Sequence, residues 1–229
     1  MALDVGKKGH EMPFDTSLRT KVLLWCDRHC CLCKKACGVN IEVDHILPEA
    51  EEGTSDLDNA IPLCFDCHSE AHRYNDAHPR GTKYKADELK ARREQVYEEF
   101  TRHLVPPVHY GVTQGLANGA RRRFPDVGFL VAHMGDSLPV RARVVVERVL
   151  ADGKRQGVGG HYSGNKLWHL NPRFSIWGHF TLPGSAEPDD GEIKVRVEVS
   201  IIDLYEREHQ QLPVEFVYLR EQDVWYLEP

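Results

Sequence analysis

The sequence lacks any apolar run near the ~18 consecutive residues that a membrane-spanning helix needs. Its first ten residues hold charged side chains and two glycines where a signal peptide has an apolar core. The 229 residues are 41% hydrophobic and 28% charged, the ordinary balance of a soluble globular chain. This composition excludes a disordered, collagenous or coiled-coil protein. We expect a cytoplasmic protein with no membrane partner.

Cysteine is absent after residue 67, although the first 67 residues contain all seven cysteines of the chain. An odd number, clustered in pairs and without an export signal, argues against disulfides and favours a metal site. The pairs Cys30-x-x-Cys33 and Cys64-x-x-Cys67 have the ligand spacing of tetrahedral Zn²⁺. The other three are interpreted as one core residue and two weaker alternative ligands: Cys26, then Cys31 and Cys37.

A surplus of positive charge is also missing. The net charge is −6, of which −4 falls in residues 1–105 and −2 in residues 106–229. A protein that grips nucleic acid by charge alone needs the opposite sign. Any nucleic-acid binding must therefore be modest or depend on local basic patches.

The hydrophobic pattern changes at Pro106-Pro107, which we interpret as a stiff linker between two domains. After a leader at residues 1–14, the first domain (15–105) mixes helices and strands. Its predicted helices are 15–28, 65–74 and 85–104, and its predicted strands are 40–47 and 60–63. The second domain (108–229) shows about seven apolar runs with a period of two, separated by turn signals, which predicts an antiparallel sandwich or barrel.

The candidate catalytic residues lie between the two cysteine pairs and directly after the second pair. Asp44 and His45 end an apolar strand, Asn59 follows, and His68 comes directly after Cys67. Strict alternation would send Asp44 and His45 to opposite faces, so we expect a twist or bulge there. The order of these residues over about residues 17–74 resembles the HNH endonuclease family. Its pattern is seen here in Val43-Asp44-His45-Ile46-Leu47-Pro48, Glu52-Gly53 and Asn59-Ala60-Ile61-Pro62-Leu63-Cys64-x2-Cys67-His68.

This resemblance implies an α+β domain of the ββα-metal type that hydrolyses double-stranded DNA to 5′-phosphate and 3′-hydroxyl ends. His45 would be the general base, and Asp44 and His68 would hold one divalent ion, with Mg²⁺ preferred over Mn²⁺ or Ni²⁺. Asn59 would fix the loop and orient His45, or lend an oxygen to the metal. Cys30, Cys33, Cys64 and Cys67 would bind structural Zn²⁺.

The chain departs from the family pattern in two places. The family often has Gly-Gly where this chain has Glu52-Gly53, and often has a lysine a few residues after its last histidine. That basic role would pass here to His72 or Arg73, as candidate DNA contacts.

Two further interpretations accompany the nuclease hypothesis, an alternative for the first domain and a role for the second. A catalytically inactive zinc ribbon that binds nucleic acid or protein would need the four cysteines but not Asp44, His45, Asn59 and His68. Residues 108–229 offer no catalytic constellation, so we interpret them as a targeting or regulatory domain. It would recognise DNA, a small-molecule or protein activator, or a second copy of the chain, as in a restriction or anti-phage enzyme.

Overall fold

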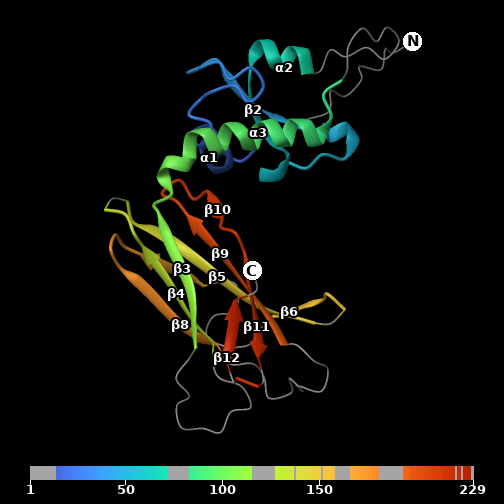
Figure 1. Cartoon of the computed structure of the whole chain (residues 1–229). Helices are drawn as coiled ribbons and strands as arrows, with labels where there is room; N and C mark the ends of the chain where they lie inside the picture. Colours follow the sequence, from blue (N-terminus) through green and yellow to red (C-terminus); the bar gives the residue numbers. More distant parts are fainter. Residues whose placement is uncertain are drawn as a thin grey trace, which may run out of the picture. The chain divides into compact units, whose positions relative to one another are not determined.

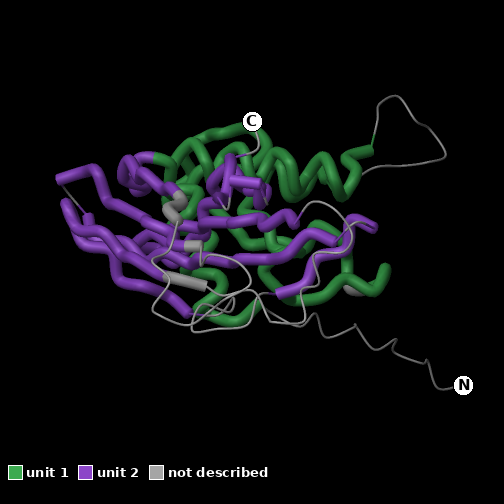
Figure 2. Tube along the Cα trace, turned by 60° about the horizontal axis from the view of Figure 1, so that its bottom comes forward, with its two compact units in different colours: residues 1–102 green, residues 103–229 purple. Residues whose placement is uncertain are grey.

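A computed structural model describes residues 14–71, 83–114, 127–136, 138–150, 152–157, 166–180, 193–219, 221–222 and 224–227. The chain forms two compact units, residues 1–102 and 103–229 (Figure 2). The finer boundaries at 15–105, 106–107 and 108–229 stay predictions, and residues 1–13 of the predicted leader lie outside the described residues. Among the described ranges, no helix combines the length and apolar character needed to span a membrane.

The first unit mixes helices with a two-stranded sheet (Figure 1). Strands β1 and β2 pair antiparallel in continuous register, from Ile41 opposite Cys64 to His45 opposite Ala60, so no bulge interrupts them. The elements are α1 (Thr16–Trp25), β1 (Ile41–His45), η1 (Glu49–Glu51), η2 (Leu57–Asn59), β2 (Ala60–Cys64), α2 (Phe65–Ala71) and α3 (Ala86–Thr101), followed by the turn η3 (Arg102–Leu104).

Helix α1 begins as expected but ends early. The Asp15 carboxylate caps it by accepting a hydrogen bond from the Ser17 backbone N–H at 2.9 Å. The predicted extension to residue 28 is wrong, because Asp27 and Arg28 adopt left-handed φ angles of 44° and 53°. That conformation cannot continue a right-handed helix, and it turns the chain into the cysteine-rich segment.

Helix α3 packs its predicted apolar stripe inward and also buries three residues that the pattern did not indicate, Arg93, Tyr97 and Thr101. Leu89 and Val96 are buried, and the Tyr97 ring meets the Trp25 ring of α1 edge-on at 5.5 Å. The Arg93 guanidinium is buried and donates from Nη1 to the carbonyl oxygens of the η2 region, at 3.2, 2.8 and 3.0 Å: Leu57, Asp58 and Ala60. Arg93 therefore fixes the turn that leads into β2.

The second unit is mostly β, with ten strands among the described residues instead of about seven. One sheet has the order β3-β4-β8, and another has β12-β11-β9-β5-β6, with β10 on β9 and β7 on β5 (Figure 1). Whether the sheets form a sandwich or a barrel stays a prediction. The strands are β3 (Val108–Gln114), β4 (Val127–His133), β5 (Val140–Val149), β6 (Arg155–Gly157), β7 (Leu167–Leu170), β8 (Ser175–Phe180), β9 (Ile193–Ile202), β10 (Glu208–Gln210), β11 (Val214–Leu219) and β12 (Val224–Leu227).

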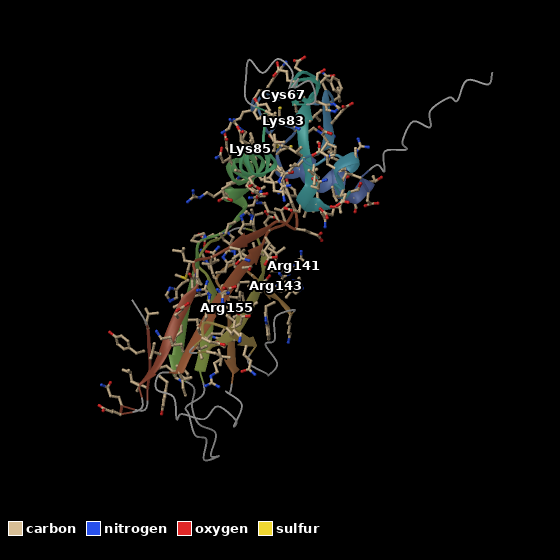
Figure 3. The ribbon with its side chains drawn as sticks, turned by 90° about the vertical axis from the view of Figure 1, so that its right-hand side faces the viewer. Cys67, Lys83, Lys85, Arg141, Arg143 and Arg155 are labelled. Carbon is tan, nitrogen blue, oxygen red and sulfur yellow. The ribbon has the colours of Figure 1, made fainter. Side chains whose placement is uncertain are left out.

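The period of two on β5 and β9 produces the core of this unit. Their inward residues join Phe129 and Val131 of β4 in one buried cluster: Val140, Ala142, Val144 and Val146, with Val195, Val197, Val199 and Ile201. The alternate positions carry ion pairs, such as Arg143 with Glu208 at 2.8 Å and Arg155 with Glu198 at 3.2 Å (Figure 3). The arginines of this sheet are thus largely neutralised by their neighbours.

Candidate functional site

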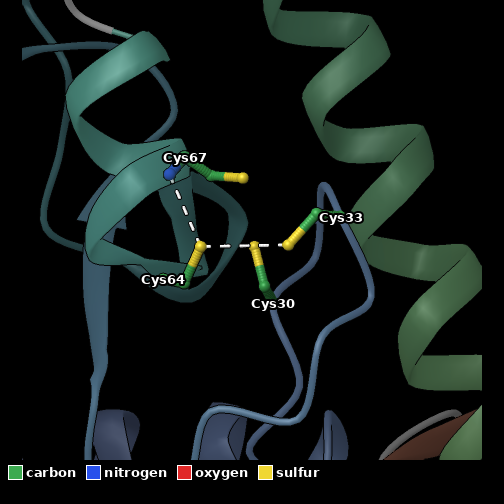
Figure 4. Close-up of side chains that lie close together, drawn as sticks. All are labelled: Cys30, Cys33, Cys64 and Cys67. Carbon is green, nitrogen blue, oxygen red and sulfur yellow. Dashed lines mark hydrogen bonds between the residues drawn. The ribbon is translucent and has the colours of Figure 1, made fainter.

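Four cysteine thiols converge in the first unit (Figure 4). The sulfur atoms of Cys30, Cys33, Cys64 and Cys67 all lie within 4.8 Å of one another, and Cys33 Sγ is 3.8 Å from Cys64 Sγ. Tetrahedral Zn²⁺ with Zn–S bonds of ~2.3 Å separates its sulfurs by about 3.8 Å. The donor set and its spacing therefore fit a structural zinc ion.

Local backbone geometry aims the two pairs at one point. Cys64 ends β2, and the Cys67 N–H in the first turn of α2 points to Cys64 Sγ at 3.4 Å. The turn that carries Cys30 and Cys33 is held against β2 because the Cys31 N–H donates to the Pro62 carbonyl at 2.9 Å. Burial, and then hydrogen bonding with the Cys64 and Cys33 thiols, raises the pKa of Cys67. A bound cation would remove this penalty by stabilising the thiolates.

The other three cysteines lie outside this cluster. Cys26, Cys31 and Cys37 are all buried. Cys26 Sγ donates to the Leu23 carbonyl at 3.6 Å, and Cys37 Sγ donates to the Lys35 carbonyl at 3.1 Å. Within the described part of the chain, the group of metal-binding side chains contains only the two Cys-x-x-Cys pairs.

Asp44 on β1 and His68 on α2 approach each other beside the sheet. His68 Nε2 lies 3.7 Å from Asp44 Oδ2, and His68 Nδ1 lies 2.8 Å from Glu42 Oε2. A carboxylate only accepts hydrogen bonds, so Nδ1 is the donor toward Glu42, and Nε2 is the ring nitrogen that faces Asp44. The other Asp44 oxygen, Oδ1, accepts the His45 backbone N–H at 2.8 Å. This arrangement fits a divalent cation between Asp44 and His68.

His45 sits at the end of β1, next to this pair of side chains in the sequence. Its Nε2 lies 3.0 Å from Ser55 Oγ, and its ring stacks on the Phe14 ring with a centroid distance of 4.2 Å. Phe14, which the sequence placed at the end of the leader, is buried in this unit. The imidazole is thus held on one face by an aromatic ring and at one nitrogen by a hydroxyl.

Asn59 is buried and binds the backbone of the loop between the two strands. Its Oδ1 accepts the Leu47 N–H at 2.8 Å, and its Nδ2 donates to the carbonyls of Leu47 and Thr54 at 2.9 and 2.7 Å. These three amide contacts all go to the loop that carries Ser55 toward His45. The structure thus relates Asn59 to His45 through the loop.

The same loop explains the Glu52-Gly53 pair. Glu52 has a φ of 65°, the left-handed region that favours glycine. A Cβ on Gly53 would lie 1.8 Å from the Leu47 carbonyl oxygen, so no larger residue fits without a backbone shift. Position 52 therefore requires a residue that adopts a positive φ, and position 53 requires a residue without a side chain.

The residues that sequence reasoning missed are Glu42, Ser55 and Phe14. Glu42 had a readable signal, because it precedes Asp44 by two residues and so shares its face of β1. Ser55 and Phe14 had none, since their contacts with His45 depend on the path of a loop and of the chain before α1. The candidate DNA contacts His72 and Arg73 lie outside the described residues.

Comparison with known proteins gives one match to a family, and it falls on this site. A search of curated proteins finds no match. Solved structures similar to the chain include the periplasmic chaperone SfaE (16% identity, TM-score 0.32, covering 47% of this chain and 55% of the chaperone). Another is a Northeast Structural Genomics Consortium target, SoR45 (9% identity, TM-score 0.31, covering 47% of this chain and 84% of that one). Residues 29–74 match the HNH endonuclease family, so the N-terminal part of the chain contains an HNH domain.

Proposed function

We propose that this protein is a metal-dependent endonuclease that hydrolyses phosphodiester bonds of double-stranded DNA at the Asp44–His45–His68 site. The observation that carries the proposal is the orientation of His68, whose Nδ1 is held by Glu42 at 2.8 Å while Nε2 lies 3.7 Å from Asp44 Oδ2. Glu42 and Asp44 thus turn one imidazole nitrogen toward a carboxylate, as a metal site requires. The family match at residues 29–74 supports the same activity.

The chemistry follows from the reacting groups. A phosphodiester is anionic and has a poor leaving group, so the attacking water must lose a proton and charge must be neutralised. His45 takes the proton from water, because imidazole titrates near neutral pH. Asp44 and His68 would hold the divalent cation, Mg²⁺ in the first instance with Mn²⁺ or Ni²⁺ as substitutes, and when bound it would supply positive charge to the phosphate and the leaving oxygen. Ser55 and Phe14 keep the His45 ring in place.

The second unit, in this proposal, decides where or when the nuclease acts. It recognises a DNA feature, a small-molecule or protein activator, or a second copy of the chain. A cytoplasmic restriction or anti-phage enzyme is the setting that we propose for this combination. The alternative of an inactive zinc ribbon is not favoured, because it gives no reason for Glu42, Asp44 and His68 to converge beside the four cysteines.

The test is plasmid cleavage by purified full-length protein with Mg²⁺, Mn²⁺ or Ni²⁺, and with EDTA as the control. Replacing the base, His45→Ala, should leave the zinc content unchanged and lower the nicking rate by about 10²–10⁴-fold. The matched control is His169→Ala, which removes an exposed imidazole from β7 of the second unit. Nicking by His45→Ala at the wild-type rate would remove this mechanism.

A further inference from the structure

A cleft of about 770 Å³ extends from the proposed catalytic residues to the start of α3. Its lining includes Asp44 and His45, and also Lys83 and Lys85, which directly precede the helix. Both lysine side chains are exposed, and Figure 3 marks them in the first unit. Two cations therefore share one concave surface with the residues assigned to phosphodiester cleavage.

The two lysines differ from most other cations of α3 and its surroundings in having no acidic partner among the described residues. Lys34 pairs with Glu99, Lys90 with Asp58 and Arg92 with Glu88. No ion pair between described residues involves Lys83 or Lys85, although Glu51 also lines the cleft. In a chain with a net charge of −6, these two cations are therefore not engaged in ion pairs with the described carboxylates around them.

We propose that Lys83 and Lys85 form a phosphate-binding subsite that holds the nucleic-acid strand beside the bond being cut. The proposal rests on the proposed nuclease function and adds how the substrate is held. A strand whose phosphate reaches His45 must carry its neighbouring phosphates along the same cleft. Both lysines line the same cleft as Asp44 and His45, so their ammonium groups are available to those neighbouring phosphates.

The chemistry of lysine determines which part of the nucleic acid the subsite recognises. An ammonium group is a compact point charge that binds phosphate without the fixed fork geometry of arginine. Contacts to phosphate position the strand but carry no sequence information. The subsite therefore contributes affinity and register that are independent of base sequence, and it explains how an acidic protein binds a polyanion.

The experiment measures DNA binding by full-length protein in the His45→Ala background, where cleavage is blocked. The probes are two fluorescein-labelled 20-base-pair duplexes of unrelated sequence, titrated by fluorescence anisotropy at several NaCl concentrations. The double variant Lys83→Gln/Lys85→Gln should weaken binding equally for both duplexes. The slope of log affinity against log salt should become shallower by roughly 1.8, because two phosphate contacts are lost at about 0.9 each.

Two controls separate the subsite from a general charge effect. Lys83→Arg/Lys85→Arg keeps both charges and should keep the salt slope. Lys35→Gln/Arg102→Gln removes two exposed cations of the first unit that do not line the cleft, and should leave the slope unchanged. An unchanged slope in Lys83→Gln/Lys85→Gln, an equal loss in the Lys35/Arg102 variant, or no DNA binding at all overturns the proposal.

Cleavage by the chain with His45 restored distinguishes this inference from the nuclease itself. The Lys83→Gln/Lys85→Gln enzyme should show a raised KM with kcat retained, since the lost contacts act equally on bound substrate and transition state. If the wild-type protein binds DNA through these lysines but does not cut it, the nuclease fails and the subsite stands. If it cuts and the lysine variant binds with the wild-type salt slope, the subsite fails and the nuclease stands.

Discussion

At the scale of single residues, Glu42 decides which nitrogen of His68 faces Asp44. The 2.8 Å contact between Glu42 Oε2 and His68 Nδ1 holds the ring so that Nε2 faces Asp44. Such carboxylate partners of metal-binding histidines typically change metal affinity by about 10–100-fold when they are removed. In the function that we propose, Glu42 is therefore a positioning residue that would act on the metal through His68.

We predict that Glu42→Ala lowers the affinity for Mn²⁺ by about 10–100-fold, because the His68 ring loses its anchor. Glu42→Gln should lose less, since its amide oxygen still accepts the Nδ1 proton. Isothermal titration of Mn²⁺ into zinc-loaded protein measures both. Glu70→Gln, on the exposed surface of α2, is the control for the loss of a negative charge. Equal Mn²⁺ affinity in wild type and Glu42→Ala would contradict the assignment.

Gly53 provides a second prediction at this scale. Gly53→Ala places a methyl group where the Leu47 carbonyl oxygen lies 1.8 Å away, so the backbone of the loop must move. We expect a loss of more than about 1 kcal/mol of stability and a fall in nicking rate, because this loop carries Ser55 to His45. Thermal unfolding and plasmid nicking are the measurements. Gly157→Ala, with no atom within 4 Å of the added Cβ, should change neither, and a neutral Gly53→Ala would show that the loop is adaptable.

At the scale of elements, sequence periodicity found those that bury an apolar stripe and missed features fixed by long-range contacts. The alternation on β5 and β9 and the apolar stripe of α3 match the structure closely. The burial of Arg93 was not readable, because its three carbonyl partners lie more than 30 residues away in sequence. The short strands β6 and β10 were missed because each has only three residues and little apolar pattern.

The candidate site shows the same division. The convergence of the four cysteines was predictable, because a tetrahedral zinc site needs thiolates at this spacing. The assignment of Asp44 and His68 to a divalent ion stays a prediction. The convergence of Asp44 and His45 on one cleft was expected to require a twist or bulge, yet the pairing of β1 with β2 is continuous to His45. His45 reaches the cleft because it is the last residue of the strand, where the chain turns away.

The four-cysteine cluster joins the turn after α1 to the β2–α2 junction, which the Cys31 N–H to Pro62 carbonyl hydrogen bond also holds together. Structural Zn²⁺ contributes about 10–16 kcal/mol of apparent binding free energy, which is available to folding. Cys64→Ser should therefore unfold the first unit and abolish tight zinc binding, while the strands of the second unit stay protected. Elemental analysis and hydrogen-exchange mass spectrometry provide the two readouts.

The matched control for this prediction is Cys37→Ser, since Cys37 is buried but lies outside the cluster and its hydroxyl replacement still donates to the Lys35 carbonyl. It should keep one zinc per chain. The assignment is wrong if wild-type protein holds no tightly bound metal, or holds iron, or if Cys64→Ser keeps wild-type protection in the first unit.

At the scale of the whole molecule, the chain combines two units of different chemistry. The first holds all seven cysteines and the HNH match, and the second is a cysteine-free β unit with a core of its own. The HNH match covers residues 29–74, well under half of the chain. The additional residues therefore serve recognition, regulation or assembly in our proposal.

We predict that full-length protein cuts plain plasmid slowly and is accelerated by a specific DNA feature, a small molecule or a protein partner. The comparison is between full-length protein and a fragment of residues 1–104, which ends after η3 and before Val105 joins the core of the second unit. Zinc content and circular dichroism first establish that the fragment is folded. Rates and salt slopes are then measured for both proteins on the same plasmid.

If the second unit restrains the nuclease, the fragment should cut faster than the full-length protein. If the second unit supplies DNA contacts, the fragment should cut more slowly and its salt slope should be shallower, because fewer counterions are released. Identical rates, substrate choice and salt slopes would show that the second unit neither targets nor restrains cleavage.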